Sequence, residues 1–497
     1  MKHLYSLLLG GGLLLAGCNA DTKTGTTSTD QIELASLPAD TAFTITISAR
    51  PPQDLPLGAD AKQLAEFAWA EFFALNWKSS YDTIRYQRDT PDTTWTYGQP
   101  DPALAVWETY AHRTELRPYR GGMRPFNSKP AYSFRALIPP ARPGVSFSLF
   151  DNLDENNEIG SCNVYGQVKA GQPMVLYQAK VNRAEYDYIR QNYPTPDSLF
   201  AATMRTKANI KAYNAYYNPN DPNSGKYKGT CIGPRGVICL PCGGDPAQGG
   251  RGAGTIEIKT AWRQLTPADD ASRFLTRKVV YYHKQLVKGT PVTVYDNATF
   301  ALIGLHIIHK TVNYPDFVFA TWEHVDVEQA NMGLRLILTN KQGKDSLGAL
   351  QSPYPRLHPI TAVANRATAA AHRQLRALNP QSVLLNYRLV GVQGTPTSTT
   401  TTPNFFLANY VVESDSTLAN FHGSGIGTPH NQGLNTLYKG KFLSAGGCQG
   451  CHGVAQLTGG TDLSFLLDTV DKPVRAPDID ESQRNKLVRY IRATIRR

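Results

Sequence analysis

Three residues near the carboxyl terminus have side chains and a spacing that could do chemistry together. Cys448 and Cys451 are separated by two residues, and His452 follows directly. Two thiols at this spacing can add to the two vinyl groups of one porphyrin, and the adjacent imidazole can then reach the iron. Cys-x-x-Cys-His is the attachment signature of c-type haem. The sequence therefore predicts one covalently bound haem c with His452 as the proximal ligand of the iron.

A redox dithiol or a zinc site could also use two cysteines at this spacing, but each would need different neighbouring elements. A redox dithiol of the thioredoxin type should open a helix after a strand, and a zinc site should have a second pair of ligands close by. Haem is the interpretation that we favour, because the other end of the chain directs export to the compartment where haem c is attached.

The sixth ligand of the iron is left open. A methionine downstream of the haem motif is the usual choice, but no Met follows Met332. A histidine or a methionine from elsewhere could bind, or the iron could be five-coordinate and open to a small molecule. His422 and His430 lie nearest in the sequence, in a glycine-rich segment, although each could also be an ordinary loop histidine.

A second concentration of ionisable side chains lies within residues 305–326. His306 and His309 would share one face of a helix, but they would lie on opposite faces of a strand. Together with His324 and two nearby carboxylates they could line a haem-facing or substrate-facing cleft, or bind a metal. The plainest alternative is three core histidines whose hydrogen bonds are satisfied.

Four further cysteines fall in the middle of the chain, at Cys162, Cys231, Cys239 and Cys242. In an oxidising compartment they would pair, so we expect two disulfides, with three possible connectivities. A structural zinc site, a redox pair and free thiols are the alternatives.

The amino terminus reads as an export signal. Lys2 precedes an apolar stretch over residues 4–16, which is too short to anchor the chain across a bilayer. Residues 15–18, Leu-Ala-Gly-Cys, resemble the lipobox of bacterial lipoproteins, which implies cleavage before Cys18 and its acylation. We therefore expect a protein of the cell envelope that faces the periplasm, with Asn19 slightly favouring the outer membrane.

Helices and strands alternate irregularly between the two ends. We expect helices over residues 61–77, 103–116, 362–378, 434–445 and 482–495. We expect strands over residues 131–138, 174–181, 255–260, 278–286 and 317–322, and a pair of strands over 383–393 and 404–413.

This pattern predicts four segments. Residues 1–17 are the signal peptide, residues 18–50 a flexible stalk, and residues 51–430 a large α+β domain with a sandwich-like sheet. Residues 431–497 should form a small all-α unit, because a helix entering the haem motif and a terminal helix crossing it resemble the class I cytochrome c fold.

Four segments of the large domain also look familiar. Residues 178–183, 256–262, 303–311 and 319–326 resemble a group of uncharacterised bacterial cytochrome c family lipoproteins, which likewise place a large domain before a terminal haem motif. The resemblance implies haem binding and electron transfer, and no particular reaction.

The charge balance limits the partners. The chain of 497 residues carries 51 Lys and Arg against 40 Asp and Glu, with no long basic run, which argues against nucleic acid and suits a redox partner with an acidic docking surface. We expect a membrane-tethered mono-haem cytochrome that transfers electrons. The alternatives are a haem-dependent oxidoreductase, peroxidase-like or acting on a substrate held by the large domain, and a sugar- or protein-binding module that carries a cytochrome.

Overall fold

The computed structural model describes most of the chain between residues 43 and 467. The described residues are 43–84, 86–116, 122–130, 145, 150–153, 155–156, 175–216, 236–245, 252–327, 335–339, 345–350, 360–396, 407, 409, 411–412, 436–438, 441–443 and 445–467. Expectations for Cys18, Cys162, Cys231, His422, His430 and residues 482–495 lie outside them.

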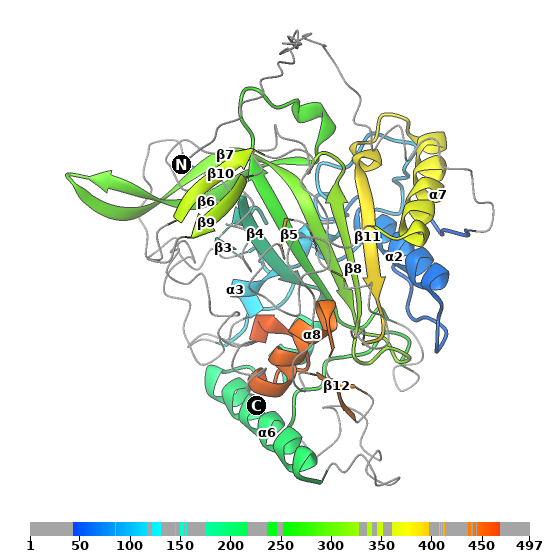
Figure 1. The fold of residues 1–497 in the computed structure, drawn as a ribbon, viewed down its shortest axis with the longest axis vertical. Helices are drawn as coiled ribbons and strands as arrows, with labels where there is room; N and C mark the ends of the chain where they lie inside the picture. Colours follow the sequence, from blue (N-terminus) through cyan, green and yellow to red (C-terminus); the bar gives the residue numbers. More distant parts are fainter. Residues whose placement is uncertain are drawn as a thin grey trace, which may run out of the picture.

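A curled, open sheet of nine strands dominates the described residues (Figure 1). Its strands are β1 (Ala111–His112), β2 (Asn152–Leu153), β3 (Glu155–Asn156), β4 (Val175–Val181), β5 (Ile256–Gln264), β6 (Thr276–Val287), β7 (Thr290–His309), β8 (Val318–His324) and β11 (Tyr387–Gln393). The long strand β7 pairs with β5 along one edge, and along its other edge with β6 and then with β8. All three pairings are antiparallel, and the change of partner along β7 lets the sheet curl.

One face of this sheet is covered by two helices, α2 (Ala61–Leu75) and α7 (Ala362–Leu378), which lie beside β8 and β11 in Figure 1. Asp60 caps α2 by accepting from the backbone N–H of Gln63, and Thr361 caps α7 in the same way. The helices bury their apolar sides against Ile258, Leu305, Trp322 and other core residues of the strands.

The other face carries the segment that contains the cysteine motif. Side chains that alternate with the first set, such as Ile308 and Phe319, share a second apolar cluster with Cys448 and Leu463. Here lie α3 (Arg113–Leu116), α5 (Arg183–Asn192), α6 (Pro196–Tyr216), α8 (Gly447–Val454), the π-helical turn η7 (Ala455–Gly459) and the 3₁₀ turn η8 (Phe465–Leu467). The motif therefore packs directly on the large sheet.

Two small hairpins complete the described elements. One joins β9 (Arg335–Thr339) to β10 (Asp345–Leu350), and the other joins β12 (Thr436–Tyr438) to β13 (Lys441–Leu443). No helix in the described part of the chain is both long and apolar enough to cross a bilayer.

Several expectations are confirmed. The chain is a mixture of helix and strand, α2 and α7 lie where their apolar spacing predicts them, and five of the expected strands match β4, β5, β6, β8 and β11. The expected sandwich is instead a single curled sheet. A separate small all-α unit at the carboxyl terminus is not confirmed, because its described part packs in one cluster with sheet residues.

Two expected helices are wrong. Residues 103–116 form a 3₁₀ turn (η1, Trp107–Thr109), the short strand β1 and the single turn α3. Residues 434–445 contain the β12–β13 hairpin. In both segments the apolar residues meet sheet residues or a partner strand, and these tertiary contacts override local helix spacing.

Candidate functional site

Helix α8 holds the three residues of the motif. Cys448 and Cys451 are one helical turn apart, and His452 follows on the same helix. Neither cysteine forms a disulfide, and both are buried, with exposed fractions of 8% and 2%. The helix thus presents two reduced sulfurs and one imidazole within a turn and a half, which suits attachment of a porphyrin at two points.

Gln393, the last residue of β11, holds the start of this helix. Its amide Nε2 donates to the carbonyl oxygen of Gly446 at 3.1 Å, and its Oε1 accepts from the backbone N–H of Gln449 at 2.9 Å. Gly447 lies between them with φ +65°, and a Cβ atom there would come within 2.9 Å of the same Oε1. Glycine is therefore required by both the backbone and the close approach.

Two further amide side chains fix the helix. Gln456 accepts from the N–H of Leu437 at 2.9 Å and donates to the carbonyl of the same residue at 3.1 Å, which ties the helix to β12. Gln449 donates to the carbonyl oxygen of Asp316 at 3.3 Å, just before β8. All three glutamines are buried, so these bonds are made away from water.

The hydrogen bond of His452 decides which of its nitrogens can bind a metal. Its Nδ1 lies 2.6 Å from the carbonyl oxygen of Leu463, and a carbonyl can only accept, so Nδ1 carries the proton. Nε2 then keeps its lone pair, and it makes no hydrogen bond to any described residue. Metal-binding histidines are oriented in this way by a carbonyl behind the ring.

The surroundings of His452 keep it neutral. Its ring centroid lies 4.9 Å from those of Phe319 and Phe465. Burial lowers the pKa of His452 to about 4; the Leu463 carbonyl opposes this shift, and the positive charge of Lys259 adds to it. A neutral imidazole at physiological pH is the form that binds iron.

An ion pair anchors the loop that carries this carbonyl. Asp462 and Leu463 have positive φ angles of 53° and 68°. The Asp462 carboxylate accepts from the ammonium group of Lys310, directly after β7, and from the N–H of Leu240 at 2.7 Å. Burial disfavours the charge on Lys310, but Asp462 outweighs it and raises the pKa of the lysine. The sheet thereby holds the Leu463 carbonyl in place.

The structure separates the histidines that are candidates for the distal ligand. His306 pairs in register with Lys259 on β5 and Thr321 on β8, so it faces the same side of the sheet as Phe319 and His452. Burial lowers the pKa of His306 to about 3, and the charges of Lys259 and His452 contribute to this shift. Of the three histidines within residues 305–326, His306 is the one that faces the motif.

His309 and His324 face the opposite side, towards α2 and α7, and do not join a site with His306. His309 contacts the carboxylate of Glu71 through Nδ1 and the carbonyl of Ala253 through Nε2. His324 donates through Nε2 to the carbonyl of Arg273 at 3.0 Å, and its Nδ1 accepts from the N–H of Asp326. Both are core histidines with satisfied rings, as the plainest interpretation of the sequence has them, and they do not line one cleft with His306.

The described residues contain no group of three or more His, Cys, Asp or Glu side chains that could hold a metal ion. Cys239 is disulfide-bonded to a partner outside the described residues. Cys242 is a free thiol, which contradicts our expectation that all four central cysteines pair.

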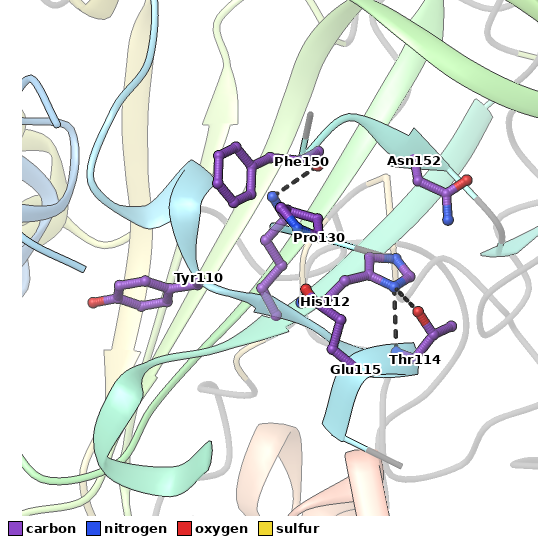
Figure 2. Close-up of a pocket in the computed structure, with 8 residues that line it drawn as sticks. Tyr110, His112, Thr114, Glu115, Pro130, Phe150 and Asn152 are labelled. Carbon is purple, nitrogen blue, oxygen red and sulfur yellow. Dashed lines mark hydrogen bonds between the residues drawn. The ribbon is translucent and has the colours of Figure 1, made fainter. Parts of the chain in front are cut away.

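A small pocket beside β1 and β4 is lined by Tyr110, His112, Phe150 and Lys180, among others (Figure 2). The Lys180 ammonium donates to the carbonyl oxygens of Glu108 and, at 2.9 Å, Phe150. Burial lowers the pKa of Lys180 to about 8. The described lining has room for about one water molecule, so the pocket is too small for an organic substrate.

The β12–β13 hairpin bears on the dithiol alternative. A strand followed by a helix that opens with the two cysteines is the arrangement expected of a redox dithiol. A reactive thiolate, however, must reach solvent or a partner disulfide. Cys448 and Cys451 are buried, and the orientation of His452 serves no purpose in thiol exchange, so both features argue against a redox dithiol.

No family model, curated protein or solved structure matches this chain. The argument for a function therefore rests on the site itself.

Sequence analysis missed the residues that position the motif. Gln393, Lys310 and Asp462 lie 59, 142 and 10 residues from His452 in the chain, and nothing in their local sequence marks them as its neighbours. The one local signal is the pair of polar residues Asp462 and Ser464, which flank Leu463 just before the apolar run of residues 465–467.

Proposed function

We propose that this protein is an electron-transfer protein that binds one haem c covalently through Cys448 and Cys451, with His452 as the proximal ligand of the iron. The observation that carries the proposal is the hydrogen bond from His452 Nδ1 to the Leu463 carbonyl, on the same helix as two free, buried thiols. It leaves Nε2 as the metal-binding atom.

The bound group would supply reversible one-electron chemistry at the iron. The chain's own residues would hold it. The thiols would form thioether bonds, and Leu463 orients the imidazole. The hydrogen bond to the Leu463 carbonyl raises the basicity of the imidazole, against the effect of burial. Phe319 and Phe465 pack against the ring and shield part of it from water, which favours electron transfer because less solvent must reorganise.

The setting belongs to the same proposal. Residues 1–17 serve as a signal peptide, Cys18 as the acylated anchor, and residues 18–50 as the stalk, so that the protein faces the periplasm from a membrane, with the outer membrane favoured. Residues 431–497 complete a cytochrome c-like unit against the large sheet. A partner with an acidic surface supplies or accepts the electron, in keeping with the excess of basic residues.

A haem-dependent oxidoreductase is the second candidate, and the position of His306 bears on it. A histidine on the His452 side of the sheet could bind the iron or act on a small molecule bound there. Carbon monoxide separates the two functions. A reduced spectrum that ignores the gas supports electron transfer, whereas ready binding supports the oxidoreductase.

The test of the proposal is maturation of the full chain in a host that attaches haem c. We expect red protein whose carboxyl-terminal peptide gains the mass of one haem, with the spectrum of two thioether bonds. Cys448→Ala and Cys451→Ala together should remove all covalent haem, while Cys242→Ala, a free cysteine outside the motif, should leave it unchanged. Colourless wild-type protein with a Cys448–Cys451 disulfide would instead establish a redox dithiol.

A further inference from the structure

Two acidic side chains are buried behind the loop that orients His452. Glu185 lies in the first turn of α5 with an exposed fraction of 0%, and Glu257 lies on β5 with 4%. The two carboxyl groups lie close enough to share a hydrogen bond if one of them carries a proton. Neither oxygen of Glu185, nor Oε1 of Glu257, accepts a hydrogen bond from a nitrogen or hydroxyl donor of the described residues.

This arrangement requires a proton. An ionised carboxylate can only accept, so two carboxyl groups bond to each other only when at least one of them is protonated. Two buried like charges in contact would repel strongly, and one proton removes that repulsion. The pair is therefore a site that holds one proton and can take up a second.

The pair is connected to His452 through the same loop. The Ser464 hydroxyl is hydrogen-bonded to Glu257. Ser464 directly follows Leu463, whose carbonyl accepts from His452. One peptide unit and two hydrogen bonds thus lie between the acid pair and the proposed iron ligand, and neither glutamate touches that ligand itself.

Three charged side chains of the described residues, Lys259, Lys310 and Asp462, act on the pair. Lys259, two residues along β5, favours the ionised form of Glu257, and Lys310 favours that of Glu185. Asp462 opposes ionisation of both, and it neutralises Lys310 by their ion pair. The register neighbours of Glu257, Val181 and Ile308, are apolar. The N-terminal end of α5 contributes a partial positive charge near Glu185.

We propose that Glu185 and Glu257 form a proton-binding site linked to the redox state of the haem iron. The inference rests on the proposed haem site. When an external one-electron donor reduces the iron from the ferric to the ferrous state, one positive charge is lost nearby, and the pair takes one proton from the solvent. Oxidation by an electron acceptor returns both the electron and the proton.

The pair titrates in the range where this linkage matters. Burial raises the pKa of Glu257 to about 7, and burial together with the charge of Glu257 raises the pKa of Glu185 well above its usual range. The pair therefore holds one proton and exchanges a second with solvent near neutral pH. Because the reduced iron favours the protonated pair, the reduction potential should fall as the pH rises.

The experiment is a spectroscopic redox titration of the full-length haem protein between pH 5 and pH 9, compared with Glu257→Gln and Glu185→Gln. In the wild type we expect the equilibrium constant for reduction to fall across the neutral range, approaching tenfold per pH unit for one proton per electron. Either variant should flatten this dependence. Glu71→Gln, which alters a buried carboxyl on the other face of the sheet, should retain it.

Infrared spectroscopy distinguishes the failure of this inference from that of the proposed function. Reduced-minus-oxidised spectra should show the carbonyl band of a newly protonated carboxyl group, and Glu257→Gln should lose it. A pH dependence or a band that persists in Glu257→Gln overturns the linkage. Protein without haem also overturns it, together with the proposed function, while a protonated-carboxyl band in that protein would show that the acid pair itself exists.

Discussion

The proton on a histidine distinguishes the proposed ligand from the core residue in this protein. His452 donates through Nδ1 and leaves Nε2 to a metal. His324 donates through Nε2 and accepts through Nδ1, so both of its nitrogens are used. The two side chains have the same chemistry in the sequence, and only their hydrogen-bond partners give them different roles.

At this scale we expect His324 to make stability depend on pH. Burial lowers the pKa of His324 to about 3, against 6.5 in the unfolded chain, so below pH 6.5 the unfolded chain binds a proton that the folded chain refuses. The contribution of His324 is present above pH 6.5 and is lost as the pH falls towards 3. Between pH 7 and pH 5 this loss amounts to about 2 kcal/mol.

Urea unfolding of the wild type and of His324→Gln at both pH values measures the effect. The variant cannot titrate, so the wild type should lose about 2 kcal/mol more than the variant on acidification. His372→Gln should show the same sign, because burial also lowers the pKa of His372, to about 4. A difference between wild type and variant that is constant with pH would contradict this expectation.

Elements are joined at the motif by buried polar contacts. Strand β11 holds the start of α8 through Gln393, and the end of β7 holds the loop after η7 through Lys310 and Asp462. Helix α6 closes the same region, where a Cβ on Gly460 would lie 2.4 Å from the Thr203 carbonyl oxygen. The short helix is therefore positioned by strands and helices far from it in the chain.

At the element scale we expect Lys310→Met to destabilise the fold by about 3–5 kcal/mol, because it leaves Asp462 charged and buried without its cation. The combined variant Lys310→Met/Asp462→Leu should cost less than the sum of its single changes, since no lone charge remains. Lys62→Met, which breaks the exposed Lys62–Glu66 pair, serves as the control and should cost less than about 1 kcal/mol. Additive costs in the cycle would show that the pair is not coupled.

At the scale of the whole molecule, the motif packs together with the sheet in one unit of the described residues. Cys448, Leu463 and Leu467 share an apolar cluster with Val181, Phe319 and Val390 of the sheet. A free-standing cytochrome would bury these residues against its own helices instead. The large sheet thus supplies one wall of the proposed haem site, which is a role for a domain that the sequence left without one.

At this scale we expect a fragment of residues 431–497 to be unable to fold alone. It lacks Gln393, Lys310 and Phe319, so its buried polar groups would lose their partners and its apolar side chains would meet water. The fragment, exported to a compartment that attaches haem c, should show no cooperative thermal unfolding and should be degraded. A stable, red fragment would show that the carboxyl-terminal unit is independent.

The sequence by itself determined the elements that depend on local spacing. The apolar repeats of α2 and α7, the alternating runs of the main strands and the Cys-x-x-Cys-His motif are all visible within about twenty residues. The choice between α-helix and strand for residues 305–309 could not be made locally, and this choice decided whether His306 and His309 would lie together. The helix expected over residues 434–445 is wrong because pairing between β12 and β13 overrides the local helical spacing.

Only the tertiary structure decided which residues serve the motif. Gln393, Lys310, Glu185 and Glu257 reach the region of His452 through strand register and helix packing, and such contacts between distant parts of a chain leave no period in the sequence. The sequence determined the chemistry that the three residues of the motif can do, because that depends on residue type and spacing. The proton on His452 depends on one carbonyl oxygen placed by the fold, so only the folded chain could determine it.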